Sequence, residues 1–235
     1  PLLAQPHSPD RVATVQSLAG MKVDQVLIGS CTNSSYTDMM TVAAVLKGKT
    51  VAPNVSLAIA PGSKQVLTML AQNGALADMI AAGARILESA CGPCIGMGQS
   101  PANGAVSLRT FNRNFQGRSG TANADIYLVS PEVAAASAVA GMLCDPRSLG
   151  AAPQVSLPDH FLVNDNMVVA PPADGSGVEV YRGPNIKPFP VNQELAANLR
   201  YKALIKVGDN ITTDHIMPSN AKLLPFRSNI EYLSD

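Results

Sequence analysis

The sequence has few charged residues, and neither sign is in excess. Charged side chains make up 14% of the 235 residues, and 17 Lys and Arg balance 17 Asp and Glu. Proteins that hold nucleic acid or an anionic membrane surface by electrostatics carry a basic excess. We therefore expect neither of these partners.

Long apolar runs are also missing. No run approaches the roughly 20 residues that span a bilayer, and the N-terminus at Pro1 has neither a Met nor a signal pattern. The chain is expected to be an interior piece of a longer protein. Its apolar fraction of 46% is enough for a real core and excludes long disorder overall.

Cysteine is sparse as well. Four cysteines are too few for a disulfide framework in a chain of 235 residues. Two of them form Cys91-Gly-Pro-Cys94, a spacing that indicates a metal or redox site in a reducing compartment. We expect the cytoplasm or, in a eukaryote, the mitochondrial matrix.

Strand and helix patterns alternate through the first part of the chain. The predicted strands cover 26–29, 55–60, 85–89, 107–111 and 125–129, and the predicted helices 37–47, 63–72, 75–82 and 131–143. Ser63 is a good N-cap, and Pro131 suits a first helical turn. This alternation predicts an α/β three-layer domain over residues 1–150, with a mostly parallel sheet covered by helices and a lead-in segment over 1–22.

The character changes near Pro146. Residues 151–198 are rich in Pro and Gly and predict a linker with one short strand at 178–184. A new β pattern begins at 201–207, and residues 199–235 are expected to start a second, truncated β-containing domain.

Cys31 and Cys91 each follow a predicted strand, where ligands bind in parallel sheets. Cys91-Gly-Pro-Cys94 can be a redox pair, half of a zinc site or part of an iron–sulfur site. A redox pair opens a helix, which the following glycines oppose, and zinc needs a fourth ligand, which Cys144 is poorly placed to supply. Three loop thiolates suit a cubane with one open iron. Spacing alone leaves these interpretations open.

Four segments in order resemble the aconitase family, together with a fifth just downstream: 28–38 (IGSCTNSSYTD), 90–96 (ACGPCIG), 111–118 (FNRNFQGR), 213–216 (TDHI) and then 225–227 (PFR). The resemblance implies a [4Fe–4S] cluster on Cys31, Cys91 and Cys94, with Asn33 beside it. It also makes residues 199–235 the start of the family's mobile swivel domain.

The resemblance further implies a tricarboxylate substrate, and dehydration and rehydration between citrate and isocitrate. It assigns the substrate carboxylates to Arg113, Arg118 and Arg227, and places Asn112 at the site. It puts Asp214 near a substrate arginine, with His215 in support, and these two are the catalytic candidates. Ordinary alternatives are solvated surface arginines, a turn at Asp214 and, for Cys144, a small buried apolar residue.

The serines and tyrosine after Asn33 resemble aconitase more than isopropylmalate isomerases, so citrate is the expected substrate. A homologous-acid dehydratase of the methylcitrate, homocitrate or isopropylmalate type is the alternative. A zinc or iron–sulfur sensor module without catalysis, and an RNA-binding regulator, are the others, although zero net charge opposes RNA. Family members complete the site from other domains, so we expect those domains as partners. We also expect this chain alone to be inactive, and the cluster can be absent from it.

Overall fold

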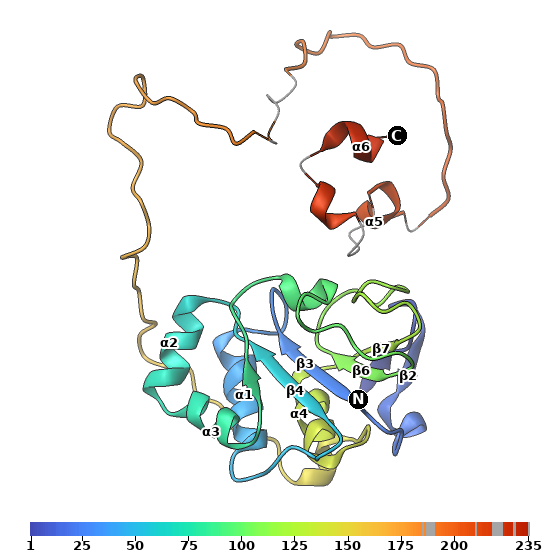
Figure 1. The fold of residues 1–235 in the computed structure, drawn as a ribbon, viewed down its shortest axis with the longest axis vertical. Helices are drawn as coiled ribbons and strands as arrows, with labels where there is room; N and C mark the ends of the chain where they lie inside the picture. The colour runs from blue at the N-terminus through green and yellow to red at the C-terminus, as the bar shows by residue number, and fades with distance from the viewer. Residues whose placement is uncertain (185, 187–190, 210, 218–222, 228, 235) are drawn as a thin grey trace. The chain divides into compact units, whose positions relative to one another are not determined.

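The computed structural model describes residues 1–235 except 185, 187–190, 210, 218–222, 228 and 235. The chain divides into two units, Pro1–Met167 and Val168–Asp235. Figure 1 labels most of the helices and strands of the two units.

The first unit is built on a seven-stranded sheet with the order β2-β1-β7-β6-β3-β4-β5. Neighbours from β7 to β5 run parallel, whereas β1 is antiparallel to both β2 and β7. The strands are β1 (Leu2–Ala4), β2 (Val12–Thr14), β3 (Gln25–Gly29), β4 (Ser56–Ala60), β5 (Arg85–Ile86), β6 (Val106–Arg109) and β7 (Asp125–Leu128). The mostly parallel sheet of an α/β domain is confirmed.

Local chemistry explains where the helices begin. The side chain of Ser63 accepts a hydrogen bond from the backbone N–H of Val66, and Pro131 opens an Ala-rich helix behind the cap Ser130. The α-helices of this unit are α1 (Tyr36–Leu46), α2 (Lys64–Gln72), α3 (Ala75–Ala81) and α4 (Pro131–Ala140), and its 3₁₀ turns are η1 (Val15–Leu18), η2 (Gly92–Ile95) and η3 (Pro146–Leu149). Each predicted helix is therefore confirmed, with ends shifted by at most a few residues.

The two faces of the sheet have different covers. Alternate residues of β3 point to opposite faces, so Val26 and Ile28 join the main apolar core, in which α1 packs against both α3 and α4. Leu27 belongs instead to a second cluster with Ala58, Cys94 and Phe111. The cover of this second face includes the segment 91–100, so a cysteine of the predicted site is part of the folded layer.

The prediction of a lead-in segment over residues 1–22 is wrong. Leu3 is buried, β1 pairs with β7, and the backbone N–H of Val15 donates to the carbonyl of Pro1. Two strands of three residues leave no readable periodicity in the sequence, because the edge of an existing sheet supplies their hydrogen bonds. This segment extends the sheet beyond β7.

The second unit contains α5 (Thr213–Ile216), η4 (Leu224–Phe226) and α6 (Ile230–Ser234). The strands predicted at 178–184 and 201–207 are wrong, since neither segment is paired with another strand in the part of the chain that is described. An alternating pattern makes a strand only when an edge is available to bond it. The linker and swivel predictions also include residues outside the described set, and the boundaries 1–150, 151–198 and 199–235 stay a prediction.

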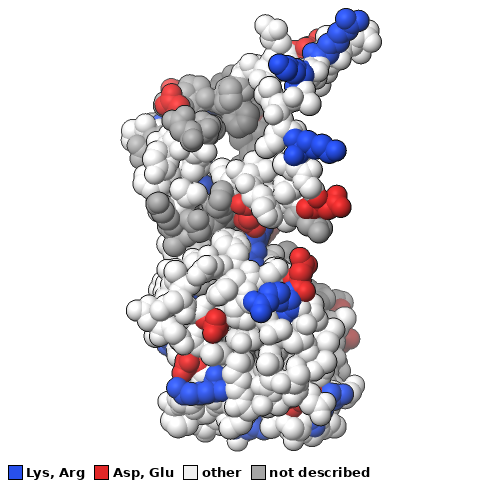
Figure 2. Space-filling view, turned by 90° about the vertical axis from the view of Figure 1, so that its right-hand side faces the viewer, with Lys and Arg blue, Asp and Glu red and all other residues white. Residues whose placement is uncertain are grey.

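Charged side chains of both signs lie on the surface of the first unit. On the face of the first unit seen in the lower part of Figure 2, basic and acidic side chains are interspersed rather than gathered by sign. Among the described residues, no helix is both long and apolar enough to cross a membrane.

Candidate metal centre

Cys31 lies in a tight loop at the carboxyl end of β3. Its neighbours Ser30 and Asn33 both have positive φ, 75° and 52°, which is uncommon outside glycine. Gly29, at φ 99°, has no room for a side chain, because a β-carbon there would lie 2.0 Å from the carbonyl oxygen of Ala60. The loop therefore turns sharply beside β4 and leaves Cys31 exposed.

Thr110 anchors this loop from the adjacent strand. It is fully buried directly after β6, and its Oγ1 accepts a hydrogen bond from the backbone N–H of Gly29 at 2.9 Å. Its carbonyl accepts from Asn33 Nδ2 and from Thr32 Oγ1. The amide of Asn33, predicted to face a cluster, is directed to this carbonyl in the described structure.

Cys91 and Cys94 lie in the loop that follows β5. Cys91 caps the 3₁₀ turn η2, which contains Cys94 and ends at Gly96 with φ 86°. The sequence predicts that no helix begins here, and the structure has only this single 3₁₀ turn. A β-carbon on Gly96 would lie 2.2 Å from the carbonyl oxygen of Ser119. Cys91 is exposed and Cys94 is buried.

The fold brings the three thiols into one electrostatic group. Burial raises the pKa of the Cys91 thiol above its ordinary value, and the charges of Cys94 and Cys31 and a hydrogen bond with the Cys31 side chain raise it further. The guanidinium of Arg118 acts in the opposite direction. Residues 60 positions apart in the sequence thus meet beyond the carboxyl ends of β3 and β5, as the strand order predicts.

Arg118 contacts the buried sulfur. Its Nη2 donates a hydrogen bond to Cys94 Sγ at 3.2 Å, and its guanidinium carbon lies 5.7 Å from the ring centre of Phe115. Only 4% of Arg118 is exposed. This arginine is therefore part of the thiol group and not a solvated surface residue.

The other predicted site residues of the first unit lie in the same loop as Arg118. Arg113 is half-buried, Asn112 is exposed, and Arg113 Nη1 donates to Asn112 Oδ1 at 3.4 Å. The structure thus keeps Asn112 and Arg113 together as neighbours.

Asp214, His215 and Arg227 belong to the second unit. His215 Nδ1 lies 3.1 Å from the backbone nitrogen of Thr212 and contacts its hydroxyl, so this ring supports the first turn of α5. Arg227 is exposed and follows η4. The roles assigned to these three residues stay predictions.

Two residues of the site were missed by the sequence reasoning, namely Thr110 and Arg109. Arg109 is the last residue of β6 and Thr110 follows it, so the available signal is their place at the end of a buried strand beside β3. Arg109 is fully buried and donates to the carbonyl oxygen of Pro93, inside the C-x-x-C loop, at 2.9 Å. Its burial is invisible in the sequence, because arginine is ordinarily a surface residue.

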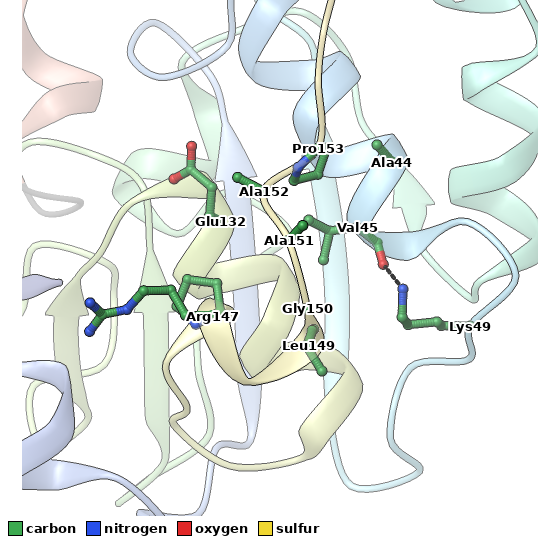
Figure 3. A pocket seen from close by; sticks show the side chains of 11 residues that line it. Ala44, Val45, Lys49, Glu132, Arg147, Leu149, Gly150, Ala151, Ala152 and Pro153 are labelled. Atoms are coloured by element: carbon green, nitrogen blue, oxygen red, sulfur yellow. Dashed lines mark hydrogen bonds between the residues drawn. The ribbon is translucent and has the colours of Figure 1, made fainter.

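Among the described residues, no three or more His, Cys, Asp or Glu side chains are placed to hold a single metal ion. A separate cavity lies between α1, the start of α4 and residues 146–153 (Figure 3). Its lining includes no cysteine, and its polar members Glu132, Arg147 and Lys49 extend away from one another in that view. The thiol group is thus distinct from this cavity.

The fold and the site define an α/β domain that gathers three thiols and an arginine beyond the carboxyl ends of its parallel strands. Residues 6–141 match the profile described as the aconitase family (aconitate hydratase). The chain belongs to the aconitase family.

Several curated proteins are similar to the chain. The homoaconitase large subunit of Thermus thermophilus is 47% identical over 150 residues, and the 3-isopropylmalate dehydratase large subunit 2 of Archaeoglobus fulgidus is 43% identical over 148 residues. The corresponding large subunit of Herpetosiphon aurantiacus is 44% identical over 150 residues. Each match covers 63% of this chain and 36% of the relative, so the matched stretch is about a third of these proteins.

The relatives named above are a homoaconitase and two 3-isopropylmalate dehydratases. The structure also shows why Ser34, Ser35 and Tyr36 are weak evidence for citrate. Ser34 Oγ donates to the carbonyl of Ser30, Ser35 caps α1, and the Tyr36 hydroxyl accepts from Asn73. These side chains bond within the fold, so they do not by themselves select a substrate.

Proposed function

We propose that the whole protein is a hydro-lyase that dehydrates and rehydrates a substituted hydroxy acid of the isopropylmalate or homocitrate type. The family and the relatives named above support a lyase of this kind. The observation that carries the proposal is the placement of Cys31, Cys91 and Cys94 in the loops that follow the parallel strands β3 and β5, with Arg118 donating to Cys94 Sγ.

The donor set fits a [4Fe–4S] cluster. Cys31, Cys91 and Cys94 would hold it, because thiolates are the usual protein ligands of such clusters and a fourth cysteine is not part of this group. Cys144 is half-buried, and its backbone N–H donates to Ser137 in α4. When bound through three thiolates, the cluster supplies one open iron that acts as a Lewis acid toward a hydroxyl group.

The residues of this chain would bind and orient the substrate beside that centre. Arg113 is the candidate for a substrate carboxylate, since a guanidinium offers planar paired donors. Arg118 already donates to Cys94, so we propose that it links the thiol group to the substrate side. Arg227, Asp214 and His215 are proposed to contribute from the second unit, and the other domains of the family as partners.

Cluster assembly tests the cysteine roles directly. Anaerobic reconstitution of this chain with iron and sulfide is expected to yield about four irons per chain and a broad visible absorbance band. Cys31→Ser, Cys91→Ser and Cys94→Ser should each lose most of both signals, and Cys144→Ser is the matched control that should retain them. Stoichiometric zinc with no cluster, or equal loss in the control, would reject the assignment.

The substrate class is tested with the whole protein. Turnover of 3-isopropylmalate or homoaconitate is expected to exceed turnover of citrate by at least about tenfold in kcat/KM, which corresponds to about 1.4 kcal/mol of transition-state discrimination. Arg113→Lys should reduce kcat/KM because it loses the paired donors. A preference for citrate would reject the substrate class and leave the family unchanged.

A further inference from the structure

Arg109 is a charged side chain in the interior of the first unit. It is the last residue of β6, none of it is exposed, and it is the largest of the fully buried side chains. Placing a charge in an interior is costly unless hydrogen bonds and an opposite charge compensate it. The compensation around Arg109 therefore indicates what the residue does.

Neutral acceptors satisfy its hydrogen bonds. Its Nε donates to Ser107 Oγ at 3.1 Å, and its Nη2 donates to Gln25 Oε1 at 3.0 Å. Its remaining bonds run to the cysteine loop, to the carbonyls of Pro93 and Gln99, both at 2.9 Å. The guanidinium thus ties two strands of the sheet to both ends of the segment that carries Cys94.

An acidic partner is not among these contacts. Within the described part of the chain, Arg109 forms no ion pair with Asp or Glu, and the Phe111 ring centre is 5.7 Å from its guanidinium carbon. Its guanidinium lies instead at the loop of Cys94, because its Nη1 donates to the carbonyl of Pro93, the residue directly before Cys94. Burial lowers the pKa of Arg109 to about 10, the Cys94 charge opposes this, and Arg118 adds to it.

We infer that Arg109 is a positioning residue and the buried counter-charge for an iron–sulfur cluster held by Cys31, Cys91 and Cys94. The inference rests on the proposed function. Its hydrogen bonds hold the loop that presents Cys94, and its positive charge offsets part of the negative charge that three thiolates bring. The reduction potential of a cluster depends on local charge as well as on hydrogen bonds and exposure.

The test compares Arg109→Gln, which removes the charge, with Arg109→Lys, which keeps it. Arg85→Gln is the matched control, because exposed Arg85 also bonds Gln99, through its side-chain oxygen, but carries no interaction with the thiols. The chain is reconstituted anaerobically, its midpoint potential is measured by an EPR-monitored titration, and unfolding of the apo form in urea checks the fold.

R109Q is expected to lower the potential, because a reduced cluster loses a stabilising positive charge. The ratio of reduced to oxidised cluster at a fixed potential should fall about tenfold, which is 59 mV for one electron. R109K and R85Q should keep the potential of the unsubstituted chain. Removal of iron by a chelator should also be several times faster in R109Q than in R109K.

The outcomes separate the two proposals. A folded R109Q chain with an unchanged potential, or an equal fall in R109Q and R109K, overturns the counter-charge role and leaves the cluster assignment intact. If R109Q does not fold, R109K decides, since a tenfold shift with the charge retained overturns the role. If the unsubstituted chain forms no cluster, the proposed function fails and this inference fails with it.

Discussion

Two glycines in the loop after Cys94 differ in what surrounds them. Gly96 faces the Ser119 carbonyl and the Ser100 hydroxyl, whereas nothing lies within 4 Å of a β-carbon placed on Gly98. Both have positive φ, 86° and 63°. A side chain at either position would be strained by the left-handed backbone, but only at Gly98 would it find open space.

Gly96→Ala is therefore expected to destabilise the first unit by about 3 kcal/mol, because both strain and a clash with rigid backbone are introduced. Gly98→Ala, the control, should cost only about 1 kcal/mol, from the left-handed conformation alone. Urea unfolding at pH 7 measures both values. Equal losses in the two variants would contradict the close approach at Gly96.

Asp24 connects two strands through a single carboxylate. It accepts from Lys22 Nζ at 2.7 Å and from the backbone N–H of Val106 at 3.0 Å. The Lys22 hydrogen bond, followed by that of Val106, lowers the pKa of Asp24 below its ordinary value. The folded state thus favours the charged form.

Because the folded pKa is lowered, this stabilisation is present above the ordinary Asp pKa of about 3.9 and is lost as pH falls through the folded value. Asp24→Asn should lower the free energy of unfolding by about 1 kcal/mol at pH 7, and the difference should shrink below about pH 4. Urea titrations from pH 7 to pH 3 measure it, with exposed Asp10→Asn as the control. A difference that is constant across this range would refute the contribution of the charge.

At the scale of elements, α1 begins directly after the cysteine loop, and its cap connects the two. Ser35 Oγ accepts from the Asp38 backbone N–H, and the Asp38 carboxylate accepts from the backbone N–H of Ser35. This capping box satisfies two donors that the helix itself cannot bond. The loop of Cys31 is thus held at one end by β3 and at the other by the first turn of α1.

Ser35→Ala is expected to lower the free energy of unfolding by about 1 kcal/mol, since the cap is lost. Thr37→Ala in the same first turn is the control and should be neutral or slightly stabilising, because alanine has the higher helix propensity. Thermal unfolding followed by circular dichroism distinguishes the two. A Thr37→Ala variant as unstable as Ser35→Ala would show that the cap is unimportant.

At the scale of the molecule, both apolar clusters belong to the first unit. Their buried residues all fall between Leu3 and Leu143. Residues 151–167 add peripheral contacts, among them an edge-on contact of Phe161 with Tyr36 and a hydrogen bond between Lys64 and Asn166. The first unit therefore has its own complete core.

A chain that ends after Met167 should accordingly keep the urea midpoint of the first unit, since no core residue is removed. A chain that ends after Gly150 should lose about 1 kcal/mol, because the Tyr36–Phe161 contact is lost. Unfolding followed by circular dichroism compares the two truncations. If the chain that ends after Met167 fails to fold, the first unit needs contacts from the rest of the chain.

The sequence by itself determined the elements with strong periodicity. It predicted β3 to β7 and α1 to α4, because buried strands and capped helices are encoded by neighbouring residues. It also identified the cysteines, the arginine loop and the family resemblance. The citrate expectation drawn from Ser34, Ser35 and Tyr36 is less well supported than its alternative, because the relatives named above are a homoaconitase and isopropylmalate dehydratases.

Only the tertiary structure decided what depends on partners far along the chain. It pairs β1 with β7 and brings the side chains of Cys91 and Cys31 together. It also directs the Arg118 guanidinium to Cys94 Sγ and buries Arg109, which donates to the Pro93 carbonyl. None of these contacts has a local signal, since each is set by the order of strands in the sheet. Local chemistry therefore specified the cysteine loops, and the order of the strands placed these loops at the same end of the sheet.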